Sequence, residues 1–216
     1  TALQAAINAA VAANGILNLP EGEIITGPLT IGAAGSYNTC AIVGVDYDGH
    51  YSTTTSRRTV IKLKTGSNDT LFTVPASNAS DVGPGPVKFE NLWLKGNSSN
   101  QTGTVYAVNF VSHTLTSNKQ RAGFFHRVRI EDFDTGGVRA GTLRNAGIME
   151  QVVILNIGSG GVGSALIFGS CQDWRFWACD FGVTGAAVVQ DSGAQIFTFT
   201  SCNFFNGGTH GYKADS

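Results

Sequence analysis

The segments Phe176-Trp-Ala-Cys179-Asp-Phe181 and Phe199-Thr-Ser-Cys202-Asn-Phe204 share a six-residue pattern, apolar-x-x-apolar-x-apolar, that decides the fold. Three earlier copies are Phe89-Glu-Asn-Leu92-Trp-Leu94, Phe125-His-Arg-Val128-Arg-Ile130 and Met149-Glu-Gln-Val152-Val-Ile154. The copies begin 36, 24, 27 and 23 residues apart, so the last four fit one repeating coil and the first carries an inserted loop. The pattern does not match the 3.6-residue period of a helix, and its recurrence at a fixed spacing indicates a solenoid.

Each hexad is typical of a strand that ends on an inward residue, turns through two residues and resumes with alternating side chains. The two-residue turns are Glu90-Asn91, His126-Arg127, Glu150-Gln151, Trp177-Ala178 and Thr200-Ser201. A further strand lies between hexads, with copies at Val108-Asn-Phe110, Val138-Arg-Ala140, Leu166-Ile-Phe168, Val188-Val-Gln190 and Tyr212-Lys-Ala214. Three short strands per coil predict an all-β, right-handed, single-stranded parallel β-helix. An antiparallel sandwich also has short strands and Gly-rich turns, but it does not account for the hexad.

The first residues predict an amphipathic α-helix that covers the open end of the first coil. One helix face carries Leu3, Ile7, Ala10 and Val11. The pair Asn14-Gly15 supplies a C-terminal stop. Such a helix covers apolar side chains and strand edges that would otherwise be unpaired.

We therefore expect two regions, a capping helix with the first strands over residues 1–35 and parallel β-helix coils over residues 36–216. The segment Tyr212 to Ser216 repeats the start of the coil that begins at Val188. We accordingly expect the coils to continue, so that the chain is a fragment truncated at its C-terminal end.

Composition narrows the range of partners. Charged residues make up 13% of the chain and the formal net charge is -1, which gives no electrostatic basis for binding nucleic acid. No apolar run approaches the ~20 residues that a membrane span needs, so no membrane span is expected. The loop Asp46-Tyr-Asp-Gly-His50-Tyr51 resembles half of a calcium loop but lacks the spaced acidic ligands of an EF-hand, so we predict no cofactor, with Ca²⁺ as the alternative.

The four cysteines have no spacing typical of zinc ligands or of a redox motif, and no metal site is predicted. Cys179 and Cys202 occupy the same hexad position in adjacent coils, so their backbones should lie about 4.8 Å apart. We expect two stacked thiols there, with a disulfide as the alternative.

The N-terminal motifs resemble those of the pectin-lyase-like superfamily, which includes phage tailspikes and depolymerases. They are Thr1-Ala-Leu-Gln-Ala-Ala-Ile-Asn-Ala-Ala, Leu17-Asn-Leu-Pro-Glu-Gly-Glu, Gly27-Pro-Leu-Thr-Ile31, Thr39-Cys-Ala-Ile-Val-Gly44 and Thr59-Val-Ile-Lys62. The resemblance covers nearly the whole chain as architecture, and it specifies fold more than chemistry.

This resemblance implies a phage tailspike-type protein that binds a bacterial surface polysaccharide, with depolymerisation of that polysaccharide left open. It also implies an extracellular or virion location and a homotrimer or another side-by-side association of identical β-helices. Ile167 and Val189, in outward positions of neighbouring coils, favour such an association. Two alternatives remain, a secreted polysaccharide lyase or glycoside hydrolase and a non-catalytic structural or adhesive β-helix.

In this superfamily carbohydrate lies along an outer sheet, and one coil offers acid, base and cation together there. Glu131, Asp132 and Asp134 leave the strand that ends at Ile130, and Arg139 points outward from the next strand. Two carboxylates near an arginine could bind a metal-bridged uronate, act as acid and base on a glycosidic bond, or hold sugar hydroxyls. We predict Asp132, Asp134 and Arg139 as catalytic residues and Glu131 as a substrate-binding residue, with a solvated turn and a surface ion pair as the alternative.

Four further residues are predicted to bind substrate. Trp93 occupies the outward position of its hexad, where an exposed ring could stack on a sugar, with packing under a loop as the alternative. Asn109, Lys213 and Asp191 belong to the strands between hexads or to the turns that follow them. Trp177 falls in a turn and is a second candidate for an exposed ring.

Overall fold

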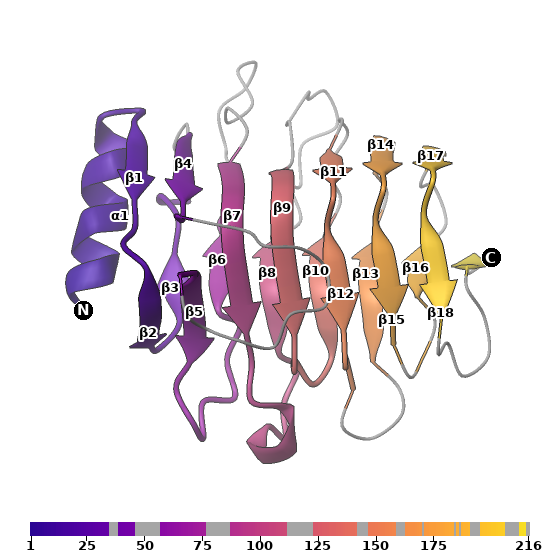
Figure 1. Cartoon of the computed structure of the whole chain (residues 1–216), viewed down its shortest axis with the longest axis horizontal. Coiled ribbons are helices and arrows are strands. Elements are labelled where there is room, and N and C mark those ends of the chain that lie inside the picture. Colours follow the sequence, from indigo (N-terminus) through magenta and orange to yellow (C-terminus); the bar gives the residue numbers. More distant parts are fainter. Residues whose placement is uncertain are drawn as a thin grey trace.

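The computed structural model describes residues 1–34, 39–45, 57–76, 87–111, 123–141, 147–158, 163–169, 171–183, 185, 187–190, 195–205 and 212–214. Within these ranges one α-helix and one short 3-10 helix, η1 (Ser98–Asn100), accompany 19 strands, and every strand pair is parallel. Figure 1 shows the strands of successive coils side by side, from α1 at one end to β18 near the other. The predicted boundary near residue 35 lies outside the described residues.

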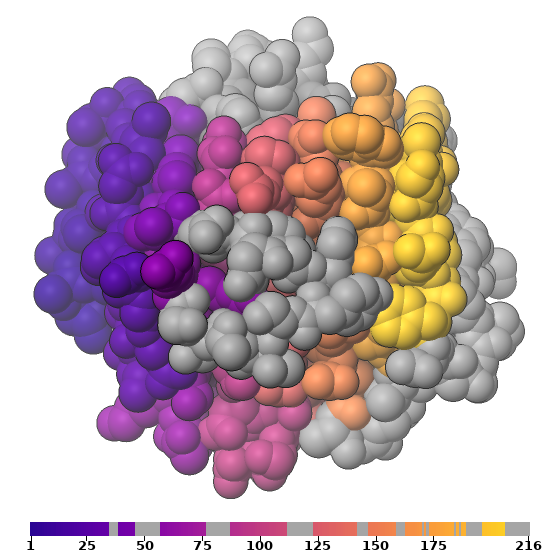
Figure 2. Space-filling model, in the orientation of Figure 1, coloured from indigo at the N-terminus to yellow at the C-terminus, as the bar shows by residue number. Residues whose placement is uncertain are grey.

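The strands form three ladders, and each coil contributes one segment to each ladder. The first ladder consists of β1 (Ile16–Asn18), β4 (Cys40–Val43), the N-terminal halves of β7 (Val87–Lys95) and β9 (Gly123–Glu131), β11 (Ile148–Glu150), β14 (Gln172–Trp177) and β17 (Gln195–Thr200). The second consists of β2 (Gly22–Thr26), β5 (Thr59–Leu63), the C-terminal halves of β7 and β9, β12 (Val153–Leu155), β15 (Asp180–Gly182) and β18 (Asn203–Phe205). The third consists of β3 (Leu29–Thr30), β6 (Phe72–Val74), β8 (Tyr106–Phe110), β10 (Gly136–Ala140), β13 (Ser164–Phe168), β16 (Val188–Gln190) and β19 (Tyr212–Ala214). The described residues thus form seven coils of a right-handed parallel β-helix, and in the space-filling view these coils appear as adjoining bands (Figure 2).

The hexads stack in the predicted register. Their first residues form one inward column, made of Phe89, Phe125, Met149, Phe176 and Phe199. The rings of Phe89 and Phe125 stack with centroids 5.1 Å apart, and those of Phe176 and Phe199 stack at 4.5 Å. Such a column stabilises the fold, because it removes apolar area from water in each of these five coils and adds aromatic contacts.

Each predicted turn is a bend at a single residue. The second residue of every turn has a left-handed backbone, with φ of 53° at Asn91, 55° at Arg127, 53° at Gln151, 50° at Ala178 and 54° at Ser201. This conformation costs a non-glycine residue about 1–2 kcal/mol, and it is tolerated because both flanking strands keep their ladder hydrogen bonds. The first residue of each turn therefore stays at the end of its strand and points outward.

Helix α1 (Ala2–Ala12) covers the first coil as predicted. Thr1 caps the helix, because its Oγ1 accepts a hydrogen bond from the backbone N–H of Gln4 at 3.2 Å. Ile7 is buried against the core. The side-chain amide of Gln4 donates to the carbonyl of Thr30 and accepts from its N–H, both at 2.8 Å. It thus makes the hydrogen bonds that a neighbouring strand would make at the edge of β3. Within the described residues, no helix has the length and apolar character that crossing a membrane requires.

Candidate functional site

The outer surface of the first ladder carries two columns of side chains. We call these two columns together the ladder face. One column, formed by the residues that precede the bends, contains Glu90, His126, Glu150 and Trp177. The other, two residues earlier in each strand, contains Lys88, Phe124, Ile148 and Arg175. Neighbouring rungs of a parallel sheet lie about 4.8 Å apart, so each column of four spans about 14 Å.

At one end of the ladder face Glu90 is held between two nitrogen groups. Nζ of Lys88 pairs with Oε2 of Glu90, and Nδ1 of His126 lies 3.2 Å from Oε1. The hydrogen bond from Lys88 is the largest influence on the Glu90 carboxyl, and together with that from His126 it holds the pKa below its usual value despite partial burial. When His126 is neutral and donates its Nδ1 proton to Glu90, its Nε2 is left as a proton acceptor.

At the other end an exposed indole lies beside a carboxylate. Trp177 is 50% exposed and pairs in register with Glu150 of the preceding coil. Glu150 is partly exposed and has no hydrogen-bond or ion-pair partner within the described part of the chain. An indole face accepts the apolar C–H side of a sugar ring, and a carboxylate accepts hydrogen bonds from its hydroxyls. This pair of side chains is therefore suited to binding carbohydrate.

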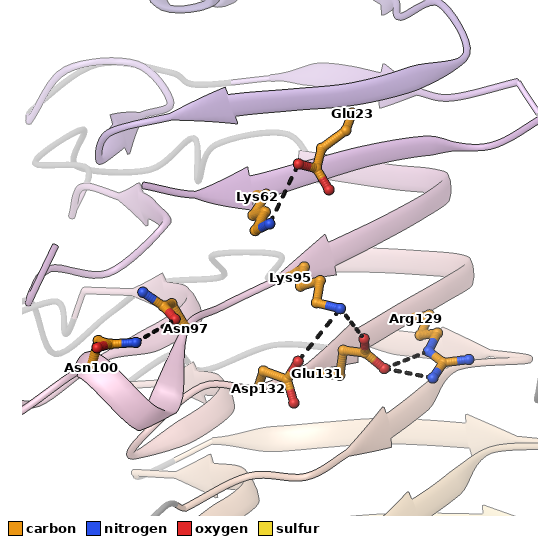
Figure 3. A network of polar contacts seen from close by, with 8 residues as sticks. All are labelled: Glu23, Lys62, Lys95, Asn97, Asn100, Arg129, Glu131 and Asp132. Atoms are coloured by element: carbon orange, nitrogen blue, oxygen red, sulfur yellow. Dashed lines mark hydrogen bonds and ion pairs between the residues drawn. The ribbon is translucent and has the colours of Figure 1, made fainter. Parts of the chain in front are cut away.

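The predicted residue Glu131 lies in a different place, within a buried polar network on the second ladder (Figure 3). It is 4% exposed, its Oε2 accepts from Nε of Arg129 at 2.8 Å, and its Oε1 lies 3.2 Å from Nζ of Lys95. Both carboxylate oxygens are thus engaged by protein cations. This arrangement is typical of a structural ion cluster and not of a carboxylate that is free to bind substrate.

Trp93 belongs to the same network. Its predicted outward position is correct, but the ring is only 5% exposed, so the packed alternative applies and an exposed stacking ring does not. The guanidinium carbon of Arg129 lies 4.6 Å from the ring centroid, and Nζ of Lys95 lies 5.0 Å from it. The aromatic face is therefore covered by cations of the protein itself.

The three residues predicted as catalytic make separate contacts. Asp132 directly follows β9 and has a φ of 62°, and Nζ of Lys95 lies 3.7 Å from its Oδ2. Burial, and next the nearby charge of Glu131, raise the pKa of Asp132 above its usual value. The backbone N–H of Asp134 donates to Oε1 of Gln101 at 3.1 Å.

Arg139 lies on the third ladder, in β10, and contacts residues of the neighbouring strand β8. Its Nη1 donates to Oδ1 of Asn109 at 3.3 Å, and its guanidinium lies 5.9 Å from the ring centroid of Tyr106. The structure thus brings together the predicted residues Arg139 and Asn109, while Glu131 and Asp132 meet around Lys95. A joint catalytic role for Asp132, Asp134 and Arg139 stays a prediction.

Asp191 and the loop over residues 46–51 lie outside the described residues. Lys213 lies in β19, in register with Val189. Among the residues that are described, no three His, Cys, Asp or Glu side chains gather closely enough to hold a metal ion.

Sequence reasoning missed Glu90, His126 and Glu150 because it assigned them to turns. The signal was nevertheless present. The first turn residue is Glu, His, Glu, Trp and Thr in successive hexads, which places polar and aromatic side chains in one repeated position. Once that residue is recognised as the end of a strand, the column follows.

No protein-family model matches the chain, and no curated protein matches its sequence. Among solved structures the chain is similar to full-length tailspike protein 2 from Escherichia coli O157:H7 bacteriophage CAB120, with a TM-score of 0.62 and 12% identity over 90% of this chain. The match covers 24% of that tailspike, so the chain spans about a quarter of its length. A second similar structure is the A-module of the mannuronan C-5 epimerase AlgE4 from Azotobacter vinelandii, with 17% identity, coverage of 94% of this chain and 73% of that one, and a TM-score of 0.45.

At these identities the likeness concerns the fold, and a TM-score of 0.45 adds no further argument. The parallel ladders and the capping helix agree with the fold that the sequence predicts. The chain has a right-handed parallel β-helix fold.

Proposed function

We propose that the chain is part of a phage tailspike-type protein and binds a bacterial surface polysaccharide along the ladder face. The observation that carries this proposal is the exposed indole of Trp177 directly beside the carboxylate of Glu150, which has no partner among the described residues. The tailspike name of the solved structure with the same fold supports the choice of class. An extracellular or virion location belongs to the same proposal.

The repeat of the ladder face suits an extended polymer. Side chains recur at each rung along a straight line, so several sugar units can make contacts at once, each of them weak. Stacking on Trp177 supplies the apolar part of the contact, while Glu150 and His126 supply hydrogen-bonding groups one and two rungs away. Affinity then depends on the whole row of residues and most strongly on the indole.

Retention on an array of purified bacterial capsular and O-antigen polysaccharides tests the proposal. Trp177→Ala should weaken binding to the retained polysaccharide about tenfold or more, which corresponds to about 1.4 kcal/mol. Ile25→Ala is the matched control, since Ile25 is 61% exposed but lies on β2 of the second ladder. Equal retention of the Trp177→Ala variant and the wild type, or no retention on any polysaccharide of the array, would contradict the proposal.

Tryptophan fluorescence gives an independent readout. Trp93 is 5% exposed and Trp174 is 0% exposed, whereas Trp177 is 50% exposed. A shift of emission on adding the retained polysaccharide should therefore come from Trp177 and should disappear in Trp177→Phe. A shift that persists in that variant would place the bound sugar elsewhere.

Cleavage of the polysaccharide is a second candidate function, and the position of His126 between Glu90 and Glu150 favours it. Glu90 holds the imidazole so that Nε2 can act as a general base, and Glu150 offers a carboxyl group on the next rung. The two glutamates stand two rungs, or roughly 9.6 Å of backbone, apart, near the upper end of the carboxyl separation of inverting glycosidases.

Shortening of the retained polysaccharide, followed by size-exclusion chromatography, tests this second function. His126→Asn should slow shortening by about 100-fold or more while retention on the polysaccharide persists. Intact polysaccharide after prolonged incubation with the wild type would leave binding as the function and exclude cleavage of that polymer.

Association into a homotrimer completes the tailspike proposal. Ile167 points outward from β13 beside Arg139 of the preceding coil, and an apolar position on an outer face suits contact between neighbouring β-helices. Light scattering on the full-length protein should give the mass of three chains. A monomeric mass would remove this part of the proposal.

A further inference from the structure

Cys179 and Cys202 occupy equivalent positions in the sixth and seventh coils. Each follows a left-handed bend residue, Ala178 or Ser201, and the backbone N–H of Asn203 donates to the carbonyl of Cys179 at 2.9 Å. The strands are therefore joined directly at the cysteines. Backbones of adjacent parallel rungs lie about 4.8 Å apart, within the range of about 4.4–6.8 Å that a disulfide spans.

We propose that Cys179 and Cys202 form a reversible oxidation site, which a low-molecular-weight disulfide converts into an intrachain disulfide that links the seventh coil to the sixth. Both residues carry thiols in the structure. The two side chains are placed alike, because Sγ of Cys179 lies 3.4 Å from the carbonyl oxygen of Trp177 and Sγ of Cys202 lies 3.4 Å from that of Thr200, one rung away.

The exchange has two balanced steps. The Cys202 thiolate attacks one sulfur of the external disulfide, whose S–S bond breaks and releases one thiolate. Cys179 then loses its proton, and its sulfur attacks the Cys202 sulfur in the mixed disulfide, which releases the second thiolate. Two protein thiols are oxidised, and one external disulfide is reduced to two thiols.

The environments of the two sulfurs set this order. Cys202 is partly exposed, and the hydrogen bond from Cys179 lowers its pKa, so it ionises first. Cys179 is buried, and the same hydrogen bond together with burial raises its pKa. Cys202 is therefore the attacking thiol, and Cys179 closes the disulfide.

The remaining cysteines are poorly placed for this chemistry. Cys40 lies on the second coil, and burial raises the pKa of its thiol to about 11. Cys171 is buried, and its Sγ donates to the carbonyl of Gly141 at 2.9 Å. Cys171 precedes β14 and Cys179 follows it, so this strand holds them farther apart than the about 6.8 Å between Cα atoms that a disulfide spans, and Cys171 cannot replace Cys202 as a partner.

The disulfide would stabilise the last described coil. Strands β17 and β18 each pair with one strand in the described chain, β14 and β15 respectively. A link between Cys179 and Cys202 closes a loop of about 24 residues, which for a chain of this size corresponds to a rise in Tm on the order of 5–10 °C.

Incubation of the reduced full chain with glutathione disulfide tests the proposal. The thiol count under denaturing conditions should fall from four to two, peptide mapping should find Cys179 joined to Cys202, and Tm should rise and return after reduction. Cys171→Ser is the matched control and should also lose two thiols.

Two variants test the order of the steps. Cys179→Ser should stop at a stable glutathione adduct on Cys202, whereas Cys202→Ser should keep its three thiols. Four thiols remaining in the wild type, a disulfide between other cysteines or between chains, or the absence of an adduct in Cys179→Ser would overturn the proposal. None of these outcomes depends on polysaccharide binding, so the result is independent of the proposed function.

Discussion

Replacing Glu131 by Gln should lower the free energy of unfolding by about 3 kcal/mol. The carboxylate is 4% exposed and pairs with Arg129 and Lys95, and neutralising one member of a buried pair costs about 3–5 kcal/mol because the other charge stays buried. We place the effect at the lower end for two reasons. The new amide oxygen can still accept from Arg129, and the ring of Trp93 still faces the guanidinium at 4.6 Å.

Urea unfolding followed by circular dichroism measures this effect, with an unchanged m value as the sign of an unchanged unfolding reaction. Glu150→Gln is the matched control, because the same chemical change at a partly exposed carboxylate with no partner among the described residues should shift stability by less than about 0.5 kcal/mol. Adding Arg129→Met to Glu131→Gln should recover more than about 1 kcal/mol, since the stranded charge is then gone. If Glu131→Gln unfolds with the wild-type midpoint yet loses retention on polysaccharide, the carboxylate serves substrate and our structural reading is wrong.

Three further changes test other features. Phe176→Ala should cost about 3–5 kcal/mol in urea unfolding, because this buried ring stacks on Phe199 at 4.5 Å, and Phe176→Leu should cost clearly less. Ala178→Gly should raise stability by about 0.5–1 kcal/mol, since φ is 50° there; a loss would mean that the bend is not left-handed. Two carboxyls should act in opposite directions on the pH dependence of stability. The pKa of Glu90 is lowered, so its contribution is present above its ordinary value of 4.5 and lost as pH falls through the folded value. The pKa of Asp132 is raised above 3.8, so its contribution is lost as pH rises through the folded value, and Asp132→Asn should be more stable than the wild type at pH 7.

Much of the fold could be predicted from the sequence because the inward positions obey a strict rule. A side chain that points into a solenoid must be apolar, and a shift of one residue would turn it outward. The column from Phe89 to Phe199 and the pairing of Val108 with Val138 are confirmed for this reason. The turns were also placed correctly, and the structure adds that each one bends at a single left-handed residue.

The candidate site could not be predicted to the same degree, because outward positions follow no such rule. An outward side chain may lie in solvent or be covered, and the pattern along one coil does not reveal which. Trp93 was correctly assigned outward, and Glu131 was expected just after a strand, yet both side chains are buried. One of the cations that pair with Glu131 is Lys95, which lies 36 residues earlier in the chain and one rung away. Such contacts appear only when coils are superimposed in their true register.

The single-residue bend also bears on how a protein of this type can change. Coils that begin 36, 24 and 27 residues apart still align Glu90, His126, Glu150 and Trp177, so differences in length are absorbed away from the bend. Insertions in the connecting segments can therefore accumulate without disturbing the alignment of these outward positions. A substitution at one of these outward positions replaces one chemical group and leaves its place on the surface unchanged. Such a surface can therefore acquire a new binding specificity by single, independent substitutions.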